Sequence, residues 1–142
     1  MWLITTQGAY SAVEDKHDAT GMTLVIRGRV HTDMKQLLEF LPQGTSIQTG
    51  GGTDYPYRVR CTREEWATAV ARMALEVDYT NFKDAVKARQ GKKRASAYMG
   101  IWSILNRLTP ARVRQREDRR WASHRPAGER LFHEVFPWDA DR

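Results

Sequence analysis

Positively charged side chains are concentrated in one short segment of this chain of 142 residues. No acidic residue lies between Asp84 and Glu117, whereas five cations surround Gly91. Lysine binds phosphate as a point charge, and arginine binds it through paired N–H donors. This segment is therefore the first candidate for contacts with a nucleic-acid backbone, and its cations are Lys87, Arg89, Lys92, Lys93 and Arg94.

A second basic run lies near the C-terminus, where Glu117 and Asp118 offset part of its charge. It resembles an arginine-rich arm that becomes ordered when it binds a polyanion. Its members are Arg112, Arg114, Arg116, Arg119, Arg120 and Arg125.

The charge of the whole chain is unevenly distributed. Residues 1–80 carry 8 basic and 10 acidic side chains, while residues 81–142 carry 15 basic and 7 acidic ones. This asymmetry points to an acidic partner, such as nucleic acid, an anionic membrane surface or an acidic protein. The alternative is a solvated basic surface that only aids solubility.

A third group of cations belongs to two predicted strands. Residues 22–31 alternate between apolar and polar side chains, and residues 55–62 do the same, with Tyr55, Tyr57, Val59 and Cys61 on the apolar side. If helices cover the apolar face, the opposite face presents cations that could bind phosphates and bases, namely Arg27, Arg29, His31, Arg58 and Arg60. The alternatives are local pairing with Glu14, Asp15 or Asp54 and burial under later helices.

The same patterns predict an α+β fold. Thr32 or Asp33 would cap a helix that ends before Pro42, and a capping box of Thr62 and Glu65 would open another that runs to about residue 77. Further helices are predicted from Asn81 to about residue 91 and from about residue 95.

The stretch that begins at Arg27 resembles the one that begins at Arg58, which suggests two ββα-like units. We therefore predict a small, mainly antiparallel four-stranded sheet with the helices on one face, because each unit alone would leave its apolar face exposed to water. Residues 1–108 would form the domain, and residues 109–142 would form a basic and then apolar helical extension.

Signals for catalysis are few. The four histidines are far apart in the sequence, and the single cysteine, Cys61, lies on the apolar side of its predicted strand. The three glycines from Gly50 lack the lysine and hydroxyl residue of a phosphate-binding loop. We expect no metal and no cofactor.

Residues 78–84 (DYTNFKD) contain many groups that could hydrogen-bond a ligand. A structural role also accounts for them: Asn81 would cap a helix, while Tyr79 and Phe82 would hold the turn against the core.

Several spaced motifs resemble those of a family of small uncharacterised bacterial and phage proteins. They are Met1-Trp2-Leu3, Tyr10-Ser11-Ala12-Val13, Arg27-Gly28-Arg29-Val30, Asp54-Tyr55-Pro56-Tyr57-Arg58, Asp78-Tyr79-Thr80-Asn81-Phe82-Lys83 and Ala97-Tyr98 with Trp102. The resemblance covers roughly residues 1–108 and implies no established activity. It raises Asp78, Tyr79, Asn81, Phe82 and Lys83 as a possible shared site.

The leading hypothesis is a nucleic-acid-binding or nucleoprotein-associated accessory protein. One alternative is a protein-interaction module or inhibitor that docks on an acidic partner through the sheet face or the apolar residues of 131–138. An enzyme acting at residues 78–84, with His31 or Asp54 nearby, is the least favoured. No apolar run is long enough to cross a bilayer and the N-terminal residues lack a secretory leader, so we expect a cytoplasmic protein.

Overall fold

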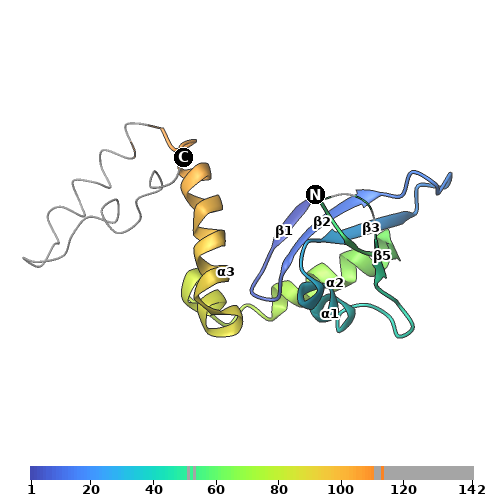
Figure 1. The fold of residues 1–142 in the computed structure, drawn as a ribbon, viewed down its shortest axis with the longest axis horizontal. Helices are drawn as coiled ribbons and strands as arrows, with labels where there is room; N and C mark the ends of the chain where they lie inside the picture. The colour runs from blue at the N-terminus through green and yellow to red at the C-terminus, as the bar shows by residue number, and fades with distance from the viewer. Residues whose placement is uncertain (51, 53, 111–112, 114–142) are drawn as a thin grey trace, which may run out of the picture. The chain divides into compact units, whose positions relative to one another are not determined.

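The computed structural model describes residues 1–50, 52, 54–110 and 113, and it has an α+β fold (Figure 1). The chain divides into two compact units, Met1–Met99 and Gly100–Arg142. The elements in chain order are β1 (Trp2–Ile4), β2 (Ala9–Glu14), β3 (Thr23–Gly28), α1 (His31–Leu38), β4 (Gln48–Thr49), β5 (Tyr57–Thr62), α2 (Arg63–Leu75) and α3 (Phe82–Asn106).

The sheet has five strands in the order β1-β2-β3-β5-β4, and every neighbouring pair is antiparallel. The prediction of four strands is therefore wrong. Three strands precede α1 and two precede α2, so the prediction of two ββα units is not confirmed. The difference arises at Thr5–Gly8, where the N-terminal segment turns back and forms a hairpin of two separate strands.

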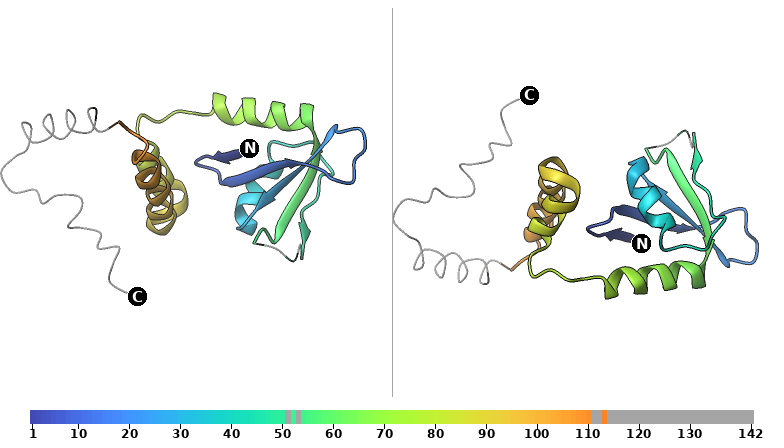
Figure 2. Two further views of the ribbon diagram at one scale, coloured as in Figure 1. Left: turned by 90° about the horizontal axis from the view of Figure 1, so that it is seen from above. Right: turned by 90° about the horizontal axis from the view of Figure 1, so that it is seen from below.

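The core lies on one face of the sheet. Leu24 and Ile26 of β3 and Val59 and Cys61 of β5 are buried there, as the alternation predicts. The helices α1 and α2 supply the opposing side chains, and the hairpin between β2 and β3 projects at one end of the sheet (Figure 2). These helical residues are Met34, Leu37, Trp66, Ala69 and Met73.

The N-terminal ends of α1 and α2 are capped differently. The capping box of Thr62 and Glu65 is present at α2, with both reciprocal hydrogen bonds. At α1 the expected side-chain cap is absent, because Val30 is the N-cap and the helix begins at His31. Asp33 lies inside the first turn of α1, where its carboxylate binds groups from other parts of the chain.

The helix α3 consists of two helical parts that meet at Gly91, which has φ of +83°. Asn81 caps its start, since the Asn81 side-chain oxygen accepts a hydrogen bond from the Asp84 N–H at 3.2 Å. The expectation of one helix before Gly91 and another after it agrees with this break. Among the described helices, none is long and apolar enough to span a bilayer.

Candidate nucleic-acid interface

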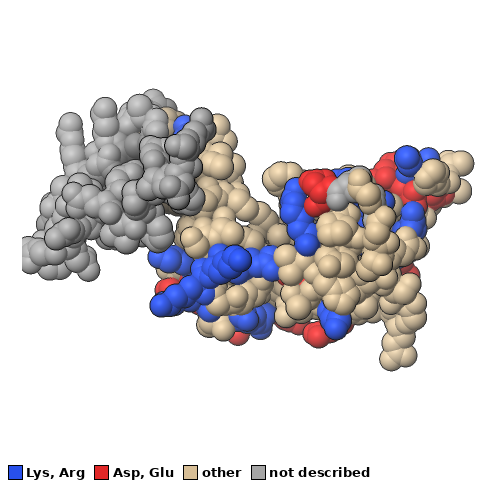
Figure 3. All heavy atoms as spheres, viewed as in Figure 1, with Lys and Arg blue, Asp and Glu red and all other residues tan. Residues whose placement is uncertain are grey.

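Three lysines of α3 are exposed on either side of the break at Gly91. Lys87, Lys92 and Lys93 make no ion pair with any residue that the structure describes. Figure 3 shows blue side chains gathered over the first part of α3. We call Lys87, Lys92 and Lys93 the α3 lysine cluster. Arg89 is also exposed, but one of its guanidinium nitrogens, Nη1, lies 3.3 Å from the Thr6 hydroxyl oxygen and donates to it.

Arg94 was predicted with this group, but it has a structural partner. Its two terminal nitrogens donate to the two carboxylate oxygens of Asp33 at 2.8 and 2.9 Å. The Asp33 side chain is 3% exposed and that of Arg94 is 20% exposed. A guanidinium engaged in this way by a buried carboxylate is not available for a phosphate.

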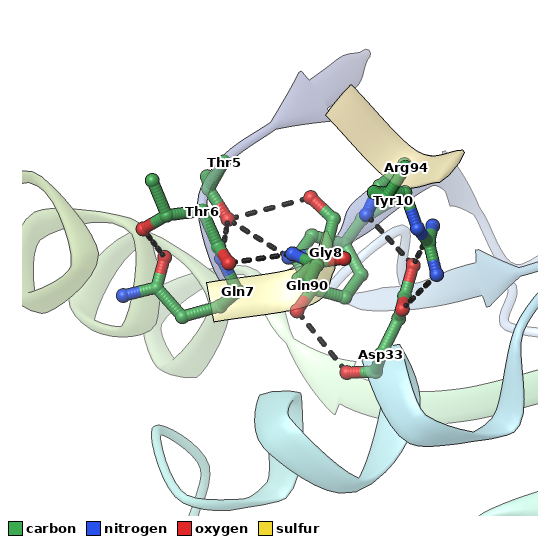
Figure 4. A network of polar contacts seen from close by, with 9 residues as sticks. Thr5, Thr6, Gln7, Gly8, Tyr10, Asp33, Gln90 and Arg94 are labelled. Carbon is green, nitrogen blue, oxygen red and sulfur yellow. Dashed lines mark hydrogen bonds and ion pairs between the residues drawn. The ribbon is translucent and has the colours of Figure 1, made fainter. Parts of the chain in front are cut away.

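Asp33 lies at the centre of a polar network (Figure 4). The Ala9 N–H donates to its carboxylate at 3.1 Å, and the Tyr10 hydroxyl donates to its backbone oxygen at the same distance. Burial, and then the nearby charge of Asp33, raise the pKa of Tyr10 above its usual value, so the hydroxyl remains a donor. The network therefore joins α1, α3 and the start of β2.

The turn between β1 and β2 also contacts α3, next to the network around Asp33. The Gln90 side chain donates to the Thr6 backbone oxygen, and the Gln7 side chain donates to Glu76 at 3.0 Å. Gly8 leaves no room for a side chain, because an added Cβ would lie 2.6 Å from the Tyr10 hydroxyl oxygen. The hydrogen bonds from Arg89 and Gln90 to Thr6 hold the first part of α3 against the turn between β1 and β2. They therefore set the position of the α3 lysine cluster.

Two of the predicted sheet arginines lie side by side on the face opposite the core. Arg27 pairs with Arg58 across β3 and β5, and Ser11 of β2 is the neighbour of Arg27 on its other side. Arg27 donates to the Ser11 hydroxyl at 2.8 Å, and its guanidinium lies 4.7 Å from the centroid of the Tyr55 ring. The prediction placed Tyr55 on the apolar side, but it lies outside β5 and its ring contacts the arginines.

The other two sheet arginines form ion pairs, as the local-pairing alternative proposed. Arg29 binds Asp54 at 2.6 Å, and both side chains are more than half exposed. Arg60 binds Asp15 at 2.7 Å and also donates to Gln48. The Arg60 hydrogen bond, followed by the His17 N–H, lowers the pKa of Asp15.

His31 is not on the arginine face. The strand β3 ends at Gly28, and His31 begins α1 with its ring centroid 5.1 Å from that of Tyr57. Tyr57 shares its face with Val59 and Cys61, which point into the core. The predicted strand was too long because the alternation continues by chance into the helix.

Within the possible shared site at Asp78, Tyr79, Asn81, Phe82 and Lys83, three residues make contacts of the kind that the structural alternative describes, and a shared functional role stays a prediction. Asn81 caps α3, and the rings of Tyr79 and Phe82 are 6.0 Å apart. Phe82 also stacks on Tyr98, with 6.0 Å between ring centroids. Asp78 and Lys83 are exposed.

The remaining predicted cations, Arg112, Arg114, Arg116, Arg119 and Arg120, lie outside the described residues, as do Arg125 and the apolar residues of 131–138. Cys61 is buried, and this burial, with the charge of Glu65, raises its pKa to about 11. No cluster of three or more metal-ligating side chains occurs in the described ranges.

The sequence reasoning missed two features. It did not find the Asp33–Arg94 pair, whose partners are 61 residues apart. It also passed over Trp2, which is 71% exposed on an edge strand and lies opposite Ser11. The alternation of Trp2 with Leu3 in a short strand was the signal that could have indicated an outward-facing aromatic ring.

No protein family, no curated protein sequence and no solved structure matches this chain. The family resemblance described above therefore stays a prediction.

Proposed function

We propose that this protein binds nucleic acid and that the α3 lysine cluster provides its main phosphate contacts. The observation that carries the proposal is that Lys87, Lys92 and Lys93 are exposed and form no ion pair within the described part of the chain. Four of the six lysines in the whole sequence lie between residues 83 and 93. A local concentration of cations of this kind binds the phosphate backbone and releases its counterions.

The contrast with the other cations supports this assignment. Arg29, Arg60 and Arg63 are each bound to a carboxylate of the same chain, and Arg94 is bound to a buried one. A phosphate would have to displace those carboxylates before it could bind. At the α3 lysine cluster a phosphate replaces only water, so the cost of binding is lower.

The network around Asp33 adds rigidity to this surface. It holds the segment of α3 next to Gly91 through Arg89, Gln90 and Arg94. A cluster held in place loses less conformational entropy on binding than the same lysines on a free tail.

Fluorescence polarisation with labelled oligonucleotides at rising salt tests the proposal. Lys92→Glu/Lys93→Glu should weaken binding at low salt by at least about 10-fold and reduce the salt slope by about 1.4 to 1.8, because two phosphate contacts are lost. Lys16→Glu/Lys35→Glu is the matched control, since it makes the same change in net charge at two exposed lysines outside α3. The control should change affinity by less than about threefold.

Two results would contradict the proposal. If both double variants weaken binding equally, only the overall charge matters and α3 is not the site. If the wild-type protein does not bind any oligonucleotide at low salt, the function is wrong. Circular dichroism of each variant checks that the fold is retained.

A further inference from the structure

Large apolar side chains gather along one side of the second helical part of α3 and of the turn that follows it. Successive residues of a helix are about 100° apart, so these side chains share one side, while Ser103 and Arg107 lie on the other. The Leu108 N–H donates to the Leu105 backbone oxygen at 2.9 Å, so the chain continues to turn past the end of α3. We call this group the α3 apolar stripe, and its members are Ile101, Trp102, Ile104, Leu105 and Leu108.

The α3 apolar stripe is largely exposed. Trp102 and Leu105 are each 56% exposed, Ile104 is 62% exposed and Leu108 is 79% exposed. A helix with one apolar side normally buries that side against a partner. Apolar side chains of this size that are exposed together mark a contact surface, and the described residues do not cover this one.

A segment outside the described residues has the chemistry of a cover for this stripe. The apolar positions of residues 131–138 (LFHEVFPW) recur at spacings of one, three and four, which predicts a short helix with one apolar side. Pro137 would end that helix. The apolar residues of the segment are Leu131, Phe132, Val135, Phe136 and Trp138.

The charges of the two segments are complementary. Residues 126–142 carry four acidic and two basic side chains, whereas no acidic residue lies between Asp84 and Glu117. An acidic segment is therefore attracted to α3. A second copy of α3 would instead bring like charges together, which disfavours a dimer through the same stripe.

The length of the chain also favours a cover from the same molecule. An extended chain covers about 3.3 Å per residue, so residues 114–130 are long enough to bring residues 131–138 back to the stripe. A tethered segment has an effective concentration of about 1 mM, which is far above the micromolar concentration of a second copy in a typical assay.

We propose that residues 131–138 dock on the α3 apolar stripe of the same chain. The apolar sides of the two segments provide the contact, and the acidic residues around 131–138 face a region that has only positive charge. Docking closes the connecting residues, which include the arginine-rich run, into a loop that is anchored at both ends. This proposal goes beyond nucleic-acid binding and does not depend on it.

Cross-linking of two engineered cysteines in the full chain tests the docking, in a Cys61→Ala background that removes the natural thiol. Leu105→Cys/Val135→Cys places one thiol on the stripe and one in the segment. Ser103→Cys/Val135→Cys is the matched control, because Ser103 is exposed on the other side of the same helix. A short bismaleimide should give at least about fivefold more cross-link within one chain for the Leu105 pair, as mass spectrometry of the digested monomer measures.

A second variant tests whether apolar contact causes the docking. Phe132→Ser/Phe136→Ser, added to the Leu105 pair, should reduce the cross-link to the level of the Ser103 pair, because the buried apolar area is lost. Circular dichroism of each variant checks that the described fold is retained.

Three results would overturn the proposal. Equal yields for the Leu105 and Ser103 pairs would show that the segment does not prefer the stripe. Cross-links mainly between two chains would show that a second copy covers it. An unchanged yield after Phe132→Ser/Phe136→Ser would show that the apolar side of the segment is not the contact. No nucleic acid is present in these measurements, so their failure leaves the proposed function standing, and absence of oligonucleotide binding leaves the docking standing.

Discussion

Replacing Arg94 by methionine should strongly destabilise the compact unit Met1–Met99, which contains the sheet. Methionine keeps most of the aliphatic stem of arginine and removes the guanidinium group. The Asp33 carboxylate, 3% exposed, then loses both of its charged hydrogen bonds and keeps the one from the Ala9 N–H. A buried charge left without its partner is the reason for the expected loss.

The expected size of the effect follows from this burial. Removing one member of a buried ion pair costs about 3 to 5 kcal/mol, whereas an exposed pair contributes about 0 to 1 kcal/mol. Domains of this size have a free energy of unfolding of about 5 to 15 kcal/mol, so Arg94→Met removes a large part of it. In urea the unfolding midpoint should fall by about 1 to 3 M.

Equilibrium unfolding in urea, followed by circular dichroism, measures this loss. Arg63→Met is the matched control, because Arg63 pairs with Glu14 at 2.6 Å and their side chains are 48% and 61% exposed. It should cost about 1 kcal/mol or less. The double variant Asp33→Asn/Arg94→Met should be more stable than the sum of its single variants implies, with a coupling energy of about 2 to 3 kcal/mol.

Two results would refute this reasoning. If Arg94→Met costs no more than Arg63→Met, the buried pair does not stabilise the fold. If Arg94→Met reduces the salt slope of oligonucleotide binding as much as Lys92→Glu/Lys93→Glu does, Arg94 contacts phosphate and the structural assignment is wrong.

Two further predictions concern Gly91 and Cys61. Gly91→Ala should lower the free energy of unfolding by about 1 to 3 kcal/mol, since no atom obstructs the new Cβ but φ of +83° is unfavourable for alanine; an equal or higher urea midpoint would show that the helix is continuous through residue 91. Cys61 in the native protein should react with iodoacetamide at pH 8 at least about 100-fold more slowly than a free cysteine, because its pKa is raised from 9.0 to about 11 and the thiol is buried. A rate equal to that in the urea-unfolded protein would contradict this burial.

Local patterns in the sequence were sufficient for several elements. Alternation predicts that β3 and β5 bury one face, and the capping box at Thr62 predicts the start of α2. Gly91 predicts the break in α3, and Asn81 predicts its cap. Each of these features depends on residues within a few positions of one another, so the physical cause is present in the local sequence.

The pairing of the cations depended on distant contacts. The turn that divides residues 2–14 into two strands is closed locally, by hydrogen bonds between Thr5 and Gly8, and the side chains of Gln90 and Glu76 add contacts from far along the chain. An arginine looks the same in a sequence whether it meets a buried carboxylate or solvent. Asp33 is 61 residues from Arg94, and only folding brings them together.

The sequence by itself therefore predicts the buried faces of β3 and β5 and the start of α2, and it shows that the positive charge is concentrated after residue 80. The tertiary structure decides which of those charges remain available. It pairs Arg94, Arg29 and Arg60 with carboxylates and leaves the α3 lysine cluster exposed. The physical reason is that an ion pair depends on distance and burial in space, and neither is contained in the spacing of residues along the chain.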